Sequence, residues 1–134
     1  MKDGTCCEKP NKAMLGLLLG LGMLGGQALA AEREFDMTIE EVTLTVAPSL
    51  DYKVFGFNAQ VPGPLIHVEE GDDVIVNVMN NSSLPHTIHW HGIHQKGSWR
   101  HDGVPGVTQK LIDAGESFTY KFKADRIGSI WYQI

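Results

Sequence analysis

The chain has 134 residues, the length of one ordinary globular domain, and it contains neither a repeat nor a low-complexity segment. Its 16 acidic residues outnumber its 11 lysines and arginines, and the formal net charge of −5 argues against nucleic acid as the main partner. The 43% share of hydrophobic residues is ordinary for a globular protein, so we expect a folded domain.

The first thirty residues have the pattern of a secretory signal. Three lysines precede the apolar run 13–24, and the small residues Ala28 and Ala30 form a cleavage-site pattern. An uncleaved membrane anchor is the alternative, but the run is shorter than the about 20 residues that a spanning helix needs. We therefore predict cleavage between Ala30 and Ala31, no membrane span after cleavage, and a periplasmic or secreted location.

This prediction divides the chain into a signal peptide, residues 1–30, and one mature domain, residues 31–134. Cys6 and Cys7 both lie in the signal peptide, so the mature domain contains no cysteine. Such a domain forms no disulfide and offers no thiolate to a metal ion.

Short segments with alternating apolar residues follow one another along the mature domain, separated by turn residues. At Val61–Pro64 we expect a type II turn with Gly63 in the position of positive φ. No long amphipathic helix is visible, and the pattern predicts an antiparallel β-sandwich or barrel. The expected strands are residues 35–46, 51–58, 65–68, 73–79, 117–123 and 128–134.

Four of the six histidines fall within residues 85–94. In a β-strand, His89 and His91 point to the same face and Trp90 points to the opposite one, where we expect it to pack in the core. The β-branched and aromatic residues around them favour a strand over a helix. We therefore expect His89 and His91 to form part of a metal site on a strand.

The residues themselves leave the metal open. A three-histidine zinc site needs a third ligand, for which His67 and His94 are candidates. A cupin-type site needs a glutamate where the chain has His94 and Gln95. A blue copper site needs a cysteine, which residues 31–134 lack.

Five blocks of the chain closely resemble the N-terminal plastocyanin-like domain of multicopper oxidases of the laccase type. The resemblance implies an all-β, cupredoxin-like Greek-key β-sandwich, and it covers nearly all of the mature domain. The blocks are Phe57–Ile66, Glu70–Asp72, His86–Gly92, Asp102–Gln109 and Gly128–Tyr132.

The resemblance implies a role for individual residues. His89 corresponds to the histidine that binds the type 2 copper, and His91 to one that binds a type 3 copper. Asp102 corresponds to an acid that assists proton delivery during dioxygen reduction, although an Asp-Gly turn explains it equally well. His94 is a further candidate ligand, and the other three histidines are expected at the surface or around the site.

The chain departs from this resemblance in its last residues. Family members continue Trp-Tyr-His-x-His, with both histidines on type 3 copper, whereas this chain has Gln133 at the first of these positions. Only two of the eight ligands of the cluster are recognisable. We therefore expect a domain that is incomplete at its C-terminus and has no oxidase activity by itself.

The complete enzyme implied by the resemblance uses copper, O2 and an unidentified electron donor. A homotrimer is expected if the parent protein has two domains. The alternative function is a stand-alone periplasmic module that binds copper or zinc through His89 and His91.

Overall fold

A computed structural model describes residues 30–134. The predicted signal peptide lies outside the described residues except for Ala30. Within the described part of the chain, no helix is long and apolar enough to cross a membrane.

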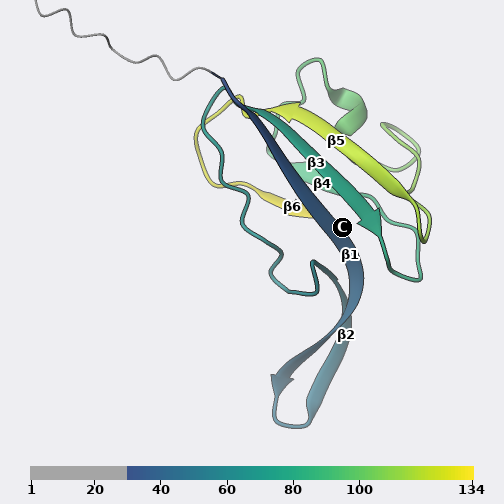
Figure 1. Cartoon of the computed structure of the whole chain (residues 1–134). Helices are drawn as coiled ribbons and strands as arrows, with labels where there is room; N and C mark the ends of the chain where they lie inside the picture. Colours follow the sequence, from purple (N-terminus) through teal and green to yellow (C-terminus); the bar gives the residue numbers. More distant parts are fainter. Residues whose placement is uncertain (1–29) are drawn as a thin grey trace, which may run out of the picture.

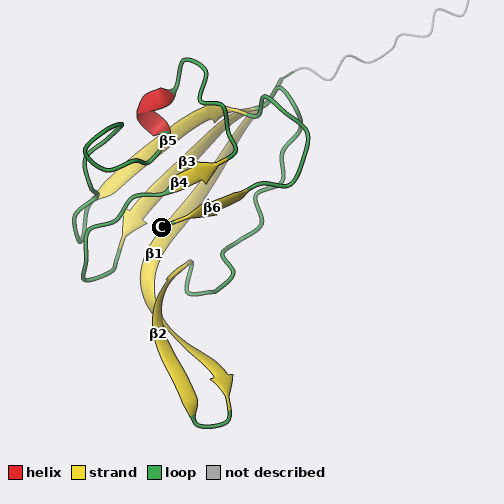
Figure 2. Ribbon diagram, turned by 180° about the vertical axis from the view of Figure 1, so that it is seen from behind, coloured by secondary structure: helices red, strands yellow, loops and turns green. Residues whose placement is uncertain are grey.

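The described residues form six strands in two sheets, and the all-β prediction is confirmed. The larger sheet has the strand order β2-β1-β3-β5 (Figure 1), and β4 and β6 form a second, two-stranded sheet that lies in front of it in Figure 2. The elements are β1 (Glu32–Ala47), β2 (Leu50–Phe57), β3 (Asp73–Asn80), β4 (His89–His91), a 3-10 turn (Trp99–His101), β5 (Ser117–Lys123) and β6 (Trp131–Gln133).

Strand β1 has two partners along its length. Its first half pairs with β3 in parallel, from Glu32 opposite Asp73 onward, so the prediction of a purely antiparallel sheet is wrong. Its second half forms an antiparallel hairpin with β2 that extends away from the rest of the domain (Figure 1). Because the hairpin leaves the core, Val46, at the end of the expected strand 35–46, is 52% exposed.

The core lies between the two sheets. Val74, Val76 and Val78 of β3 are buried, and so are Tyr120 and Phe122 of β5, as the alternation in these segments predicts. From the smaller sheet, Trp90 places its ring 5.5 Å from that of Tyr120 and 4.8 Å from that of Phe122. Trp90 is therefore a core residue, as expected, and it fixes β4 onto the larger sheet.

Two local predictions between β2 and β3 are wrong. Residues 65–68 form no strand, since they have no ladder partner among the described residues. Gly63 does not have a positive φ, so the turn is not of type II. Glycine is needed there for space, because an added Cβ would overlap the hydroxyl oxygen of Tyr132.

Candidate metal site

Strand β4 presents its two histidines on one face, as predicted. Trp90 points into the core, so His89 and His91 point away from it. Their ring centroids lie 5.8 Å apart, with an angle of 84° between the ring planes. The His89 side chain is 33% exposed, and His91 lies at the surface, so both imidazoles are accessible to a metal ion.

A backbone carbonyl fixes the orientation of His89. Nδ1 of His89 lies 2.8 Å from the carbonyl oxygen of Asp102. A carbonyl oxygen only accepts, so Nδ1 donates its hydrogen and Nε2 keeps its lone pair. This arrangement, in which one ring nitrogen is hydrogen-bonded and the other is available, is typical of metal-binding histidines.

The carboxylate of Asp102 lies beside the same ring nitrogen but does not bond to it. Oδ1 is 3.6 Å from Nδ1 of His89, which is too long for a hydrogen bond. The Asp102 side chain is 26% exposed, so it faces both the site and the solvent. The predicted acid is therefore next to His89, although it is the backbone of Asp102 that holds the ring.

The turn that carries Asp102 packs tightly under β4. Gly103 has φ +81°, and an added Cβ would overlap the carbonyl group of Ile88. The hydroxyl of Thr87 donates to the carbonyl oxygen of Gly103 at 2.7 Å. The Asp-Gly pair is thus a turn that supports the histidine strand. The role of Asp102 in proton delivery stays a prediction.

Strand β6 lies beside β4 and contributes two further side chains to the same face. In the ladder, His89 is opposite Gln133 and His91 is opposite Trp131. The Trp131 indole stacks on the imidazole of His91, with centroids 4.2 Å apart and planes within 10°. Sequence reasoning missed this contact of Trp131; the alternation of β6 could have placed it on the ligand face only once the pairing with β4 was known.

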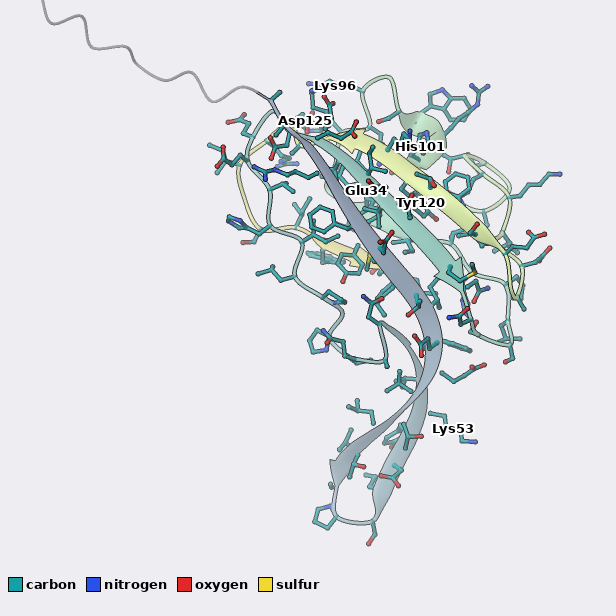
Figure 3. All side chains as sticks on the ribbon, viewed as in Figure 1. Glu34, Lys53, Lys96, His101, Tyr120 and Asp125 are labelled. Atoms are coloured by element: carbon teal, nitrogen blue, oxygen red, sulfur yellow. The ribbon has the colours of Figure 1, made fainter. Side chains whose placement is uncertain are left out.

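His94 lies in a different cluster. Its Nδ1 is 2.9 Å from Oδ2 of Asp125, and Lys96 Nζ is 3.6 Å from the same oxygen (Figure 3). The hydrogen bond from His94 lowers the pKa of Asp125. In residues 30–134 no three histidine, cysteine, aspartate or glutamate side chains gather closely enough to hold a metal ion. A role of His94 as a ligand stays a prediction.

The remaining histidines differ from one another. His67 is exposed, and His101 accepts a hydrogen bond from the backbone N–H of Lys121 at 3.1 Å. His86 is only 8% exposed, with its ring centroid 4.4 Å from that of Phe55, so of the two expected positions it does not take the one at the surface. Burial lowers the pKa of His86.

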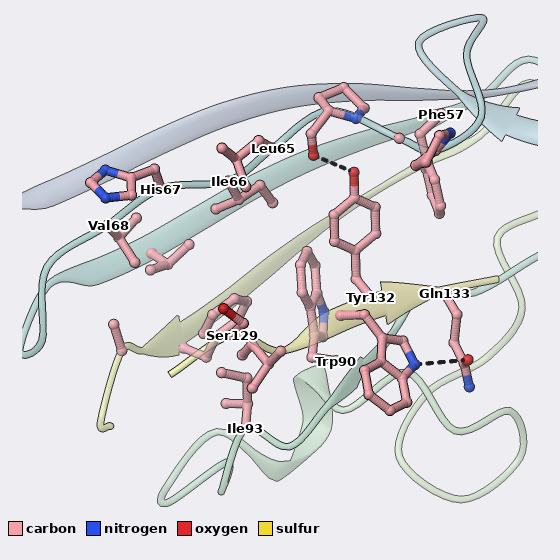
Figure 4. Close-up of a pocket in the computed structure, with 18 of the residues that line it drawn as sticks. Phe57, Leu65, Ile66, His67, Val68, Trp90, Ile93, Ser129, Tyr132 and Gln133 are labelled. Atoms are coloured by element: carbon pink, nitrogen blue, oxygen red, sulfur yellow. Dashed lines mark hydrogen bonds between the residues drawn. The ribbon is translucent and has the colours of Figure 1, made fainter. Parts of the chain in front are cut away.

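On the opposite side of β4 and β6 lies an apolar hollow of about 850 Å³. Trp90 and Tyr132 line it, and the Tyr132 hydroxyl donates across it to the carbonyl oxygen of Pro64 at 2.6 Å (Figure 4). Its walls are mostly hydrophobic side chains, and the ionisable groups that also line it, such as His67, Glu69 and Arg126, form no metal-binding cluster among the described residues. The candidate site is the histidine face of β4.

The donor set of that face fits part of a copper site. Neutral imidazole is a good ligand for copper and for zinc. His89 has one ring nitrogen oriented by a hydrogen bond and the other available, which is what a ligand requires. Two imidazoles do not by themselves complete a coordination sphere.

Comparisons with known proteins identify the family of the chain. Residues 38–133 match the family model described as multicopper oxidase. Laccase-2 of Botryotinia fuckeliana is 46% identical over 103 residues, covering 75% of this chain and 17% of that protein. Multicopper oxidase MCE of Talaromyces pinophilus is 43% identical over 97 residues, covering 69% of this chain and 16% of that protein.

Solved structures confirm the expected cupredoxin-like fold. Multicopper oxidase mgLAC is 83% identical with a TM-score of 0.74, covering 75% of this chain and 32% of that chain. A blue copper oxidase from Nitrosomonas europaea is 56% identical, with the same TM-score and coverage. The chain spans about a sixth of the curated relatives and a third of these structures. It belongs to the multicopper oxidase family.

Proposed function

We propose that this chain is the copper-binding N-terminal domain of a secreted multicopper oxidase, with residues 31–134 as its mature part. His89 supplies a ligand to the type 2 copper and His91 supplies one to a type 3 copper. The observation that carries the proposal is the imidazole pair on β4, with His89 oriented by the carbonyl of Asp102. Membership of the family supports it.

The complete enzyme would couple four one-electron oxidations of a donor to the reduction of O2 to water. Copper supplies the redox chemistry when bound. In this chain, His89 and His91 would bind the copper ions, and Trp131 shields one face of the His91 ring. The Asp102 carboxylate, with Oδ1 3.6 Å from Nδ1 of His89, would assist proton delivery beside the site. If the parent protein has two domains, a homotrimer would bring in the remaining ligands.

A copper titration tests the proposal. We expect Cu(II) to give an electron paramagnetic resonance (EPR) spectrum with nitrogen ligands and to quench the fluorescence of Trp131, because its indole stacks on His91. His89→Ala should weaken binding at least tenfold, whereas His67→Ala, an exposed histidine elsewhere, should not. Trp131→Phe should reduce the quenching, with Trp90 and Trp99 remaining, and keep the EPR signal. Identical spectra for the wild type and His89→Ala would refute the proposal.

The same proposal predicts that residues 30–134 alone are inactive. They carry two recognisable ligands of the cluster, and residues 31–134 contain no cysteine for a type 1 copper. We expect no oxidation of phenolic or diamine dyes by the purified chain in the presence of Cu(II). Copper-dependent dye oxidation that His89→Ala abolishes would contradict this expectation.

A stand-alone copper- or zinc-binding module is the second candidate. The ring centroids of His89 and His91 are 5.8 Å apart, so one ion with bonds of about 2.0–2.1 Å to nitrogen can reach both. This function predicts one ion per chain, lost with either histidine. Addition of the remaining domains should then leave the chain without oxidase activity, whereas the first candidate predicts that activity appears.

A further inference from the structure

The first residue of the predicted mature domain is attached to a buried carboxylate. The backbone nitrogen of Ala31 donates to Oδ1 of Asp72 at 2.9 Å. The carbonyl oxygen of Ala31 accepts from the backbone N–H of Asp73 at 2.9 Å. Asp72 is 2% exposed, so the residue next to the predicted cleavage bond is fixed from both sides at the start of β3.

The second carboxylate oxygen of Asp72 has its own partners. Oδ2 accepts from the backbone N–H of Glu69 and from Nε of Arg33, each at 3.0 Å. The hydrogen bonds from Ala31 and Glu69, with the nearby Arg33 guanidinium, lower the pKa of Asp72 to about 2. Asp72 is therefore ionised at physiological pH.

A buried carboxylate is costly unless it is paired with positive charge and hydrogen-bonded. Arg33 contacts only Oδ2, and its side chain is 46% exposed, so its charge is partly solvated. Among the described residues, Oδ1 has no partner other than the nitrogen of Ala31. A positive charge on that nitrogen would complete the pairing of the carboxylate.

We infer that Asp72 receives the α-ammonium group that signal cleavage creates on Ala31. A signal peptidase would hydrolyse the Ala30–Ala31 peptide bond with one water molecule. The hydroxyl of the water passes to the carbonyl carbon of Ala30, and its hydrogen passes to the nitrogen of Ala31, which takes a further proton from solvent. A neutral donor to Asp72 thereby becomes a cationic one.

Two independent observations coincide in this inference. The small-residue pattern places the cleavage bond before Ala31. The structure places the nitrogen of the same residue, and not that of a neighbour, on the buried carboxylate. The ion pair would join the beginning of β1 to β3, so processing would stabilise the exported domain independently of copper.

The proposal predicts an unusual α-amine. The carboxylate should raise the pKa of the Ala31 amine above the ordinary value of about 7.7–8.0. The charged groups on the surrounding elements are Arg33 of β1, Glu69 and Glu70 of the preceding turn, Asp73 of β3 and Lys123 of β5. Asp73 forms an ion pair with Lys123, with Oδ1 2.8 Å from Nζ. It is therefore a suitable control for Asp72, since it is a neighbouring acid that already has a cationic partner.

The experiment exports the full chain from a secreting bacterium and measures acylation of its α-amine by peptide mass spectrometry across pH. We expect a mature N-terminus at Ala31 and acylation at pH 7 at least tenfold slower than in Asp72→Asn. The α-amine of Asp73→Asn should be acylated at the same rate as that of the wild type. Prior acylation of the α-amine should lower the melting temperature of the wild type by several degrees.

Each alternative outcome overturns the inference. If the mature N-terminus lies at another residue, Ala31 carries no α-ammonium group and the proposed ion pair cannot form. A wild-type α-amine with an ordinary pKa shows that no ion pair forms, and this measurement decides the question even if Asp72→Asn fails to fold. Equal slowing in Asp72→Asn would show that burial of the amine, and not the carboxylate, protects it.

Discussion

At the scale of single residues, the histidine face depends on a backbone group. The sequence singled out Asp102 for its carboxylate, yet the atom that orients His89 is the carbonyl oxygen of Asp102. Any residue has such a carbonyl, so no side-chain pattern reveals this contact. What the sequence does show is Gly103, whose lack of a side chain allows the turn to approach β4.

Replacing Gly103 should therefore be costly. Gly103→Ala combines a positive φ with overlap of the new Cβ on Ile88, so we expect a loss of at least about 3 kcal/mol in the free energy of unfolding. Gly97 has φ +76° but nothing within 4 Å of an added Cβ, so Gly97→Ala should lose only about 1–2 kcal/mol. Urea denaturation measures both. Equal losses would show that backbone conformation alone matters at Gly103.

The buried His86 should make stability depend on pH. Its Nε2 has no hydrogen-bond partner among the described residues, and burial lowers its pKa from the usual 6.5, with Glu41 opposing the shift in part. As the pH falls, His86 therefore takes up a proton in the unfolded chain at a higher pH than in the folded protein. The free energy of unfolding should therefore decrease as the pH falls below about 6.5 and level off below the folded-state pKa.

The variant His86→Gln tests this dependence. Urea denaturation between pH 7 and 5 should show a smaller decrease in stability for His86→Gln than for the wild type. His67→Gln is the matched control, because His67 is exposed and should leave the pH dependence unchanged. A wild-type slope that persists in His86→Gln would assign the effect to another group.

At the scale of elements, β4 is too short to hold its own orientation. It pairs with β6 over three residue pairs, and a two-stranded sheet alone is marginally stable. The segment before β6 adds two contacts to the turn that follows His91. Arg126 Nη1 donates to the carbonyl oxygen of Gly92 at 2.8 Å, and Asp125 accepts from His94 at 2.9 Å.

Loss of the Arg126 contact should thus disturb copper binding. We expect Arg126→Ala to weaken Cu(II) affinity by about tenfold, because residues that orient ligands typically contribute 10–100-fold. Arg126→Lys should restore most of it. Lys123→Ala is the control, since Lys123 donates to the carbonyl oxygen of Gly71 in the same manner, outside the turn after His91. The titration by Trp131 fluorescence measures all three, and unchanged affinity in Arg126→Ala would exclude the positioning role.

At the scale of the whole molecule, the apolar hollow behind β6 is bordered by protruding side chains. Leu65 is 87% exposed and Ile127 is 84% exposed, and both line the hollow. Exposed apolar surface beside an open sheet edge favours association between chains.

Polar substitutions at this border should improve solubility. Leu65→Glu and Ile127→Glu are expected to reduce light scattering and binding of a hydrophobic dye, with little change in melting temperature, because neither side chain is buried. Val107 is 72% exposed and does not line the hollow, so Val107→Glu should have a much smaller effect. Equal effects at all three positions would indicate a general influence of charge.

The sequence alone predicted those features that depend on local alternation. The strand over residues 73–79, the strand over 117–123 and the shared face of His89 and His91 all follow from the two-residue period of a β-strand. Trp90 was placed in the core for the same reason. The resemblance of the five sequence blocks identified the family, because their spacing along the chain is specific.

Only the tertiary structure decided which segments meet. The parallel pairing of β1 with β3, the stacking of Trp131 on His91 and the contact of His94 with Asp125 join residues far apart in the chain. Residues 65–68 have a strand-like sequence, but among the described residues they have no neighbouring strand to pair with. A period within one segment fixes which side chains share a face, whereas the partner of that face is fixed by packing of the whole chain.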